Sequence, residues 1–278
     1  MPVRDDVIHI SMRGRELAGT LISPAPRMPA VLMVHGWGGS QRQYRANAHK
    51  VAALGCVCLT FDLTGHVATA SQRDTVSREE NLHDMLAAYD FLAAHPLVER
   101  DSIAVVGSSY GGYLAALLTE RRPVCWLGLR APAIYRDDDW SVPKRLLARV
   151  QKLGDYRGQP IEANDNRALR ACSRFTGDVL IVESEHDEIV PSPVLASYRK
   201  ACTKTHSLTY RVIRGADHSL GDEASREAYS SILVHWLDEM MLGARGQVRT
   251  AATKVRGGEK RETPLHRADA EPNGLMHR

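Results

Sequence analysis

The segment 107–112 reads Gly-Ser-Ser-Tyr-Gly-Gly and contains the pattern Gly-x-Ser-x-Gly. The pattern alone is a weak signal, because glycine and serine are both common residues. Here it ends the continuous apolar run 103–107 and opens the nearly all-apolar helical stretch 110–120. A sharp turn between a buried strand and a helix needs small flanking residues and exposes a serine hydroxyl at the edge of the sheet. The context predicts that Ser109 is a nucleophile; the alternative is a glycine-rich turn without chemistry.

A serine hydroxyl is a poor nucleophile unless a neighbouring base accepts its proton and a third group orients that base. The best placed of the twelve histidines is His218, which follows the predicted strand 207–213 and precedes the last predicted helix. Its loop should therefore lie at the same edge of the sheet as Ser109. Loops that flank other strands hold three competing histidines, which are His35, His66 and His186.

The orienting acid should follow a strand that lies between these two residues in the chain. The segment 183–191, Glu-Ser-Glu-His-Asp-Glu-Ile-Val-Pro, comes after the predicted strand 178–183 and offers four carboxylates. An acidic cluster of this kind could also be a metal site or a solvated loop. The chain has no His-Glu-x-x-His pattern and no clustered Cys and His residues, so no metal site is predicted. The spacing leaves the acid open among Glu183, Glu185, Asp187 and Glu188.

The elements that must position these side chains alternate between two hydrophobic periodicities. Continuous apolar runs are typical of strands buried on both faces of a sheet, and helical stretches separate them. One helical stretch begins with a capping box, Ser-x-x-Glu at 77–80. The alternation predicts an α/β fold with a mostly parallel central sheet and helices on both faces. The predicted strands are 30–35, 56–61, 103–107, 124–129, 178–183 and 207–213, and the predicted helices include 43–54 and 110–120.

Two short strands begin the body, and two later stretches lie outside this alternation. Residues 7–12 and 16–22 are predicted to form two short strands around a turn. Residues 131–176 carry many arginines, an aspartate run, glycines and prolines, and we predict that they form a small polar helical cap inserted between two strands. The tail 243–278 contains no Ile, Phe, Trp, Tyr or Cys, so it is predicted to be disordered; a basic arm for a polyanion is the alternative. The domain predicted to carry the chemistry is therefore 1–242.

Composition narrows the classes to which the protein can belong. Of its 278 residues, 44% are hydrophobic and 25% are charged, which excludes a mainly disordered or coiled-coil chain. The formal net charge is +3, but the tail carries +4 and leaves −1 on the body, so the body is predicted to bind no nucleic acid. No run approaches the ~18 apolar residues of a membrane span, so no membrane partner is predicted. The N-terminus shows no signal peptide, so we expect a cytoplasmic protein whose five cysteines are reduced.

The order Ser109, Asp187, His218, together with His-Gly-Trp-Gly-Gly at 35–39, resembles the α/β-hydrolase superfamily over about residues 20–242. The segment that holds the candidate nucleophile looks most like the small esterase, dienelactone-hydrolase-like and prolyl-oligopeptidase-like branches. The resemblance implies an α/β-hydrolase fold. It also selects Asp187 as the acid, because the Asp-x-x-Val-Pro that this residue opens matches the family's pattern.

The same resemblance implies an oxyanion hole made of two backbone N–H groups, those of Trp37 and Tyr110. Some relatives take their acid from after the sixth strand, which leaves the aspartates 137–139 as alternatives to Asp187. After another strand, many relatives carry a glycine behind Gly-His, where this chain has Val67. We expect that departure to change the shape of one loop beside the site and not the site itself.

These residues predict a serine-dependent carboxylic ester hydrolase that acts through an acyl-enzyme on Ser109, without a metal or organic cofactor. The charged cap favours small or medium soluble ester substrates over lipids, and Tyr135 and Trp140 are candidates to line an acyl pocket. Thioesterase and aminopeptidase or acyl-peptide hydrolase activities use the same machinery and stay open as alternatives. A non-catalytic binding protein with this fold is the alternative from another class, and a homodimer is also left open.

Overall fold

The computed structural model describes residues 4–12, 14–23 and 28–258. It divides the chain into two units, Met1–Met241 and Leu242–Arg278. The strands of the described residues and the candidate site belong to the first unit. No helix among the described residues is both long and apolar enough to cross a membrane.

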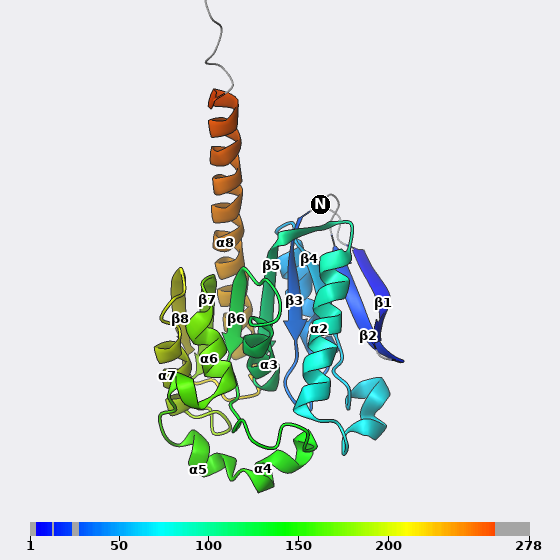
Figure 1. Cartoon of the computed structure of the whole chain (residues 1–278), viewed down its shortest axis with the longest axis vertical. Coiled ribbons are helices and arrows are strands. Elements are labelled where there is room, and N and C mark those ends of the chain that lie inside the picture. Colours follow the sequence, from blue (N-terminus) through cyan, green and yellow to red (C-terminus); the bar gives the residue numbers. More distant parts are fainter. Residues whose placement is uncertain (1–3, 13, 24–27, 259–278) are drawn as a thin grey trace, which may run out of the picture. The chain divides into compact units, whose positions relative to one another are not determined.

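The core of the first unit is an eight-stranded sheet with the strand order β1-β2-β4-β3-β5-β6-β7-β8 (Figure 1). β2 pairs with β1 and with β4 in antiparallel fashion, and all other pairings in the sheet are parallel. The predicted α/β class and mostly parallel sheet are therefore confirmed. The strands are β1 (Arg4–Met12), β2 (Arg15–Ser23), β3 (Met28–Val34), β4 (Val57–Phe61), β5 (Val98–Ser108), β6 (Trp126–Arg130), β7 (Asp178–Ser184) and β8 (Ser207–Ile213).

Alternate residues of the central strands face two helical layers. In β3, Ala30, Leu32 and Val34 belong to the hydrophobic cluster that α2 and α3 complete, whereas Val31 and Met33 are buried outside this cluster. This alternation is why the central strands are apolar on both faces. One layer consists of α2 (Arg78–Ala94), α3 (Tyr110–Leu118), α6 (Arg167–Arg174) and α7 (Ser192–Ala201). The other consists of η1 (Gln41–Tyr44), α1 (Arg45–Ala52) and the start of α8 (Glu223–Gly258), where Lys50 of α1 donates to Glu227 and Ser230 of α8.

The connection between β6 and β7 holds the segment predicted to form a cap. Two of its short helices, α4 (Leu147–Val150) and α5 (Leu153–Arg157), lie beyond the carboxyl ends of the strands (Figure 1). Leu147, Leu153 and Ile161 are buried and join the main hydrophobic cluster, so this segment packs onto the body. Its helices are η3 (Lys144–Leu146), α4 (Leu147–Val150), α5 (Leu153–Arg157), η4 (Ala163–Asp165) and α6.

The structure differs from the expectation for the tail at its beginning. α8 continues as a helix through Gly258, whereas the composition predicts disorder from residue 243. Residues 244–256 include Ala, Arg, Gln and Lys, which have high helix propensity, and no proline. Extending an existing helix is easy compared with nucleating one, so the packed part of α8 can propagate into such a sequence. The remainder of the predicted tail, 259–278, lies outside the described residues.

The five cysteines all lie in the described part of the chain, and none of them is joined to another in a disulfide. Cys56, Cys58, Cys172 and Cys202 are buried, and Cys125 is partly exposed. Burial raises the pKa of the Cys58 thiol, which keeps it protonated and unreactive at neutral pH. The buried four therefore act as small core residues.

Candidate active site

The turn that holds Ser109 has no room for side chains at its glycine positions. Ser109 connects β5 directly to α3, with φ 53° and ψ −117°. A non-glycine residue at positive φ is strained, and such strain persists only where the surrounding structure enforces it. A Cβ at Gly107 would lie 2.3 Å from the Gly111 carbonyl oxygen, and a Cβ at Gly111 would lie 2.5 Å from the Val34 carbonyl oxygen. The glycines therefore permit the turn that presents the Ser109 hydroxyl.

His218 reaches this hydroxyl from the loop between β8 and α8. Its Nε2 lies 3.0 Å from the Ser109 Oγ, and its Nδ1 lies 2.7 Å from an Asp187 carboxylate oxygen. Because Nδ1 faces a carboxylate, that nitrogen carries the proton and Nε2 is free to accept one from Ser109. The side chain of Asp187 is 3% exposed and that of His218 is 21% exposed. This geometry can activate a serine for attack on a carbonyl carbon.

The second oxygen of Asp187 is held by the backbone of its own loop. It accepts hydrogen bonds from the N–H groups of Ile189 at 2.9 Å and Val190 at 2.7 Å. These two bonds fix the rotation of the carboxylate, so its other oxygen points at His218. The Asp-x-x-Val-Pro pattern thus encodes a turn that aims the acid.

The competing acids bind other partners. Glu185 pairs with Arg214 at 3.0 Å, and Glu183 accepts a hydrogen bond from the Tyr210 hydroxyl. Asp137 accepts a hydrogen bond of 2.9 Å from the first backbone N–H of α6. Within the described part of the chain, Asp187 is therefore the acid in contact with His218.

The loop after β3 passes directly beside Ser109. A Cβ at Gly36 would lie 3.2 Å from the Ser109 Cβ, so only a glycine allows this approach without a shift. Trp37 follows, and its ring lies edge-on to that of Tyr110, with ring centroids 5.7 Å apart. Tyr110 is the first residue of α3, and the N–H groups of a first helical turn have no acceptor within the helix. Both predicted oxyanion donors thus belong to segments that flank Ser109.

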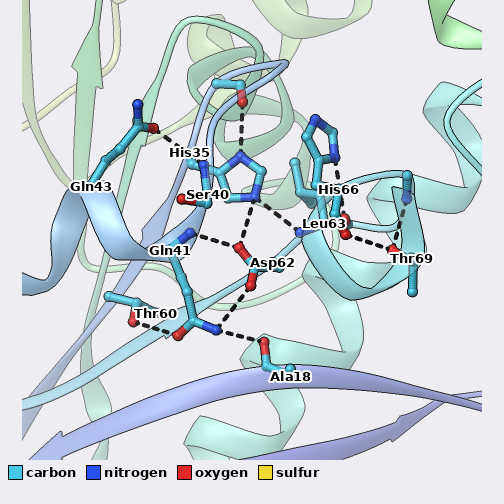
Figure 2. Close-up of polar contacts among 12 residues, drawn as sticks. Ala18, His35, Ser40, Gln41, Gln43, Thr60, Asp62, Leu63, His66 and Thr69 are labelled. Carbon is cyan, nitrogen blue, oxygen red and sulfur yellow. Dashed lines mark hydrogen bonds and ion pairs between the residues drawn. The ribbon is translucent and has the colours of Figure 1, made fainter. Parts of the chain in front are cut away.

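Two buried histidines hold this loop in place. His35 accepts the Leu63 N–H at Nε2 over 3.1 Å, and its Nδ1 lies 2.8 Å from the Gly36 carbonyl oxygen (Figure 2). His66 accepts the Gly38 N–H at Nε2 over 2.9 Å. Burial lowers the pKa of both rings, for His66 to about 4, so both are neutral at pH 7 and keep an acceptor nitrogen. These histidines are positioning residues rather than bases for Ser109.

A set of polar contacts anchors the far end of the same loop. The Asp62 carboxylate accepts hydrogen bonds from the backbone N–H of Gln41 at 2.7 Å and from its side-chain amide at 3.0 Å (Figure 2). The amide also donates to the Ala18 carbonyl oxygen at 3.2 Å. The loop is thereby tied to β2 and to the end of β4, which keeps its backbone groups preorganised.

A cavity of about 600 Å³ opens beside Ser109 and His218, between α1 and the start of α8. Its wall includes the side chains of Trp37, Tyr44 and Leu220 together with several polar groups. A volume of this size is typical of small-molecule sites. The cavity therefore gives a small substrate access to the Ser109 hydroxyl.

The two aromatic residues predicted to line an acyl pocket lie elsewhere. Tyr135 is 3% exposed and packs edge-on against Tyr110 and Tyr113, with centroid distances of 5.8 and 4.9 Å. Trp140 packs against the main cluster, with the Arg78 guanidinium 5.1 Å from its ring centroid. Neither residue lines the 600 Å³ cavity, because that cavity lies between α1 and α8 and not under the cap. Their role in substrate binding stays a prediction.

Sequence reasoning misses two buried cations near the site. Arg130 is the last residue of β6, is 5% exposed, and donates two hydrogen bonds to the His218 carbonyl oxygen. Lys144 places its Nζ 4.6 Å from the ring centroid of Trp37 and 4.9 and 4.8 Å from those of two neighbouring tyrosines. The sequence signal that could have indicated Arg130 is an arginine at the end of an apolar strand, since ligands bind at the carboxyl ends of parallel strands.

Comparison with known proteins places the chain among hydrolases of this fold. The sequence pattern of the prolyl oligopeptidase family matches residues 42–244. A curated relative, a probable 2-oxo-3-(5-oxofuran-2-ylidene)propanoate lactonase of Bradyrhizobium sp., is 25% identical over 243 residues, which cover 82% of this chain and 88% of that protein.

Solved structures agree in fold at low sequence identity. A dienelactone hydrolase from Anabaena variabilis matches with a TM-score of 0.63 and 18% identity, covering 84% of this chain and 96% of that one. Est1E from Butyrivibrio proteoclasticus matches with a TM-score of 0.63 and 20% identity, covering 85% and 98%. The fold is therefore the α/β-hydrolase fold, and because the family pattern spans most of the sequence, this chain belongs to the prolyl oligopeptidase family.

Proposed function

We propose that this protein is a serine hydrolase that cleaves carboxylic esters or lactones of small substrates through an acyl-enzyme on Ser109. The observation that carries the proposal is the hydrogen-bonded chain from Asp187 through His218 to Ser109, at the wall of a 600 Å³ cavity. The names of similar proteins, a lactonase and a dienelactone hydrolase, support the ester and lactone class.

In the first half of the reaction, Ser109 Oγ attacks the substrate carbonyl carbon while His218 Nε2 accepts its proton. The carbonyl oxygen becomes an oxyanion, and the backbone N–H groups of Trp37 and Tyr110 donate to it. The tetrahedral intermediate then breaks its bond to the leaving oxygen, which takes the proton from His218. In a lactone, the leaving oxygen stays attached to the acyl chain.

In the second half, His218 accepts a proton from a water molecule, which attacks the acyl-enzyme at the same carbon. The second tetrahedral intermediate releases the acid, and Ser109 recovers its proton from His218. Throughout, Asp187 accepts the Nδ1–H and stabilises the imidazolium that forms after each proton transfer. The carboxylate is held at 3% exposure, where its interaction with the imidazolium is little screened by water.

The test combines turnover with covalent labelling. A fluorophosphonate probe should label the wild type at Ser109, mapped by mass spectrometry, and Ser109→Ala should lose labelling together with turnover of p-nitrophenyl esters and lactones. Loss of a nucleophile of this kind typically lowers turnover on the order of a million-fold. Ser108→Ala is the matched control, because Ser108 ends β5 and, among the described residues, the hydroxyl that forms a hydrogen bond with the His218 ring is that of Ser109.

Each result that contradicts the proposal leads to a different conclusion. Labelling at Ser108, or an unchanged rate in Ser109→Ala, would overturn the assignment of the nucleophile. A wild type that neither labels nor turns over any ester, lactone, thioester or aminoacyl amide would indicate a binding protein. If the wild type prefers the thioester or the amide, the acyl-enzyme mechanism still holds but the substrate class is thioesters or amides instead of esters.

A further inference from the structure

Arg130 is a buried cation in the wall of the cavity beside Ser109. It ends β6 at the carboxyl edge of the sheet, is 5% exposed, and lines the same cavity as Ser109 and His218. Its Nη1 donates to the His218 carbonyl oxygen at 2.8 Å, and its Nη2 donates to the same oxygen. The guanidinium therefore contacts the main chain of the candidate base itself.

The guanidinium has five N–H donors, and the protein satisfies few of them. Its Nε is buried and has no acceptor among the described residues. Among those residues, no aspartate or glutamate forms an ion pair with Arg130. A buried charge without a counter-ion is unfavourable, so this position favours an anion supplied from outside the chain.

The other cations of the cavity wall already have partners or face solvent. Lys50 Nζ lies 2.8 Å from a Glu227 carboxylate oxygen. Arg226 is exposed and donates to the carbonyl oxygens of Leu220 and Gly221. Arg130 is thus the buried cation of this wall, and its position next to Ser109 suits a group carried by the substrate.

Two phenols complete the polar surface around Arg130. Tyr44 and Tyr229 are 8% and 4% exposed and line the same cavity. Burial raises the pKa of both hydroxyls, and the charge of Arg130 opposes that rise only in part. Both phenols are therefore protonated at neutral pH and can donate hydrogen bonds. A forked guanidinium and neutral hydroxyls are suited to a planar carboxylate.

We propose that the substrate carries a free carboxylate, which binds at Arg130 while its ester or lactone carbonyl lies at Ser109. The inference rests on the proposed function and adds the chemical class of the substrate. Arg130 contacts the main chain of His218, whose ring contacts Ser109, so a short acyl chain can span the distance between the two sites. Binding of the carboxylate would orient the carbonyl and supply the counter-ion that Arg130 lacks.

The experiment compares two esters that differ only at the far end of the acyl chain. p-Nitrophenyl hexanoate ends in a methyl group, and the p-nitrophenyl monoester of adipate ends in a carboxylate at the same position. After subtraction of spontaneous hydrolysis, the wild type should have a kcat/KM about tenfold to a hundredfold higher for the adipate ester, as expected for a charged hydrogen bond. The difference should lie mainly in KM.

Arg130→Gln should remove this preference, whereas Lys50→Gln should keep it as the control for general loss of positive charge. The readout is the ratio of kcat/KM for the adipate ester to kcat/KM for the hexanoate. Because Arg130 also contacts His218, its loss can lower the rates with both substrates together. A ratio that stays unchanged while both rates fall would overturn the inference and leave Arg130 with a positioning role. A wild type that prefers the hexanoate would also overturn it.

A second measurement separates this inference from the proposed function. Calorimetric titration of Ser109→Ala with both esters reports binding without turnover, and tighter binding of the adipate ester supports the carboxylate site even if the proposed reaction fails. Equal binding overturns the inference while leaving the reaction intact. If Arg130→Gln does not fold, the wild type should still discriminate against the p-nitrophenyl ester of 6-aminohexanoate, and equal use of the cationic ester would overturn the inference.

Discussion

The substitution Asp187→Asn tests the contact between His218 and its acid with almost no change in side-chain shape. The Asp187 side chain is 3% exposed, and one of its oxygens lies 2.7 Å from His218 Nδ1. In the wild type this contact fixes the proton on Nδ1. The perturbation therefore acts on the position of one proton of the imidazole ring.

The surroundings of residue 187 leave the new amide a single favourable orientation. One Asp187 oxygen accepts the N–H groups of Ile189 and Val190 at 2.9 and 2.7 Å. The amide oxygen must take that side, because an NH₂ group there would face two donors and leave both unsatisfied. The NH₂ group then faces His218 and donates to Nδ1. The ring proton moves to Nε2, and His218 can no longer accept the proton of Ser109.

The expected loss in turnover is large and concentrated in kcat. The same exchange in a related triad costs about ten-thousand-fold, which corresponds to an increase of about 5 kcal/mol in activation free energy. KM should change little, because the buried Asp187 does not line the cavity. The melting temperature should also change little, because every hydrogen bond of the carboxylate has a counterpart in the amide.

Initial rates with a p-nitrophenyl ester, together with a thermal melt, measure both expectations. The matched control is Glu185→Gln two residues away, whose carboxylate pairs with Arg214 and should be dispensable for turnover. If Asp187→Asn kept most of the activity, the tautomer argument would be refuted. If, in addition, substitution at Asp137 abolished turnover, the acid would come from the segment after β6.

Two further predictions concern the loops beside the site. Burial, with a smaller effect of His35, lowers the pKa of His66 from 6.5 to about 4, so the folded protein binds this proton at lower pH than the unfolded chain. The free energy of unfolding should then fall as the pH drops through this window, by up to about 3 kcal/mol from His66. Urea titrations at several pH values should show a shallower fall in His66→Gln than in the exposed control His186→Gln, and equal falls would contradict the assignment. Val67 has φ 46°, a conformation that costs a non-glycine residue roughly 1–2 kcal/mol. Val67→Gly should therefore keep or raise the melting temperature, Val67→Ala should not raise it, and a clear loss in the glycine variant would refute backbone strain at this position.

The strands, helices and tight turns could be predicted from residues that are close together in the sequence. The capping box at the start of α2 is present as predicted, with the Ser77 hydroxyl accepting from the Glu80 N–H and the Glu80 side chain accepting from the Ser77 N–H. The apolar runs became the parallel strands because only a sheet covered on both faces buries every residue of such a run. The glycines around Ser109 were readable in the same way, because the close backbone contacts that require them lie within the turn or against the adjacent strand.

Contacts between segments that are far apart in the sequence could not be predicted from local patterns. Local pattern left four acids open beside His218, and the selection of Asp187 needed a resemblance to other proteins. In the structure the selection depends on how the ends of β7 and β8 meet, which brings together residues 31 positions apart. The extension of α8 past residue 243 also has a non-local cause, since its propagation starts from a segment packed on the sheet.

Arg130 and the two loop histidines show most clearly the difference between what the local sequence predicts and what tertiary contacts decide. By sequence, Arg130 is a charged residue at the end of an apolar strand, and His35 and His66 are competitors of His218. Folding places the Arg130 guanidinium against a carbonyl 88 positions away, and it turns both histidines toward the backbone of Gly36 and Gly38 in the loop beside Ser109. Hydrophobic periodicity determines which residues are buried, but it carries no information on the partner that a buried polar group meets. That partner is selected by the register of the sheet and the packing of its loops, which form only when the whole domain folds.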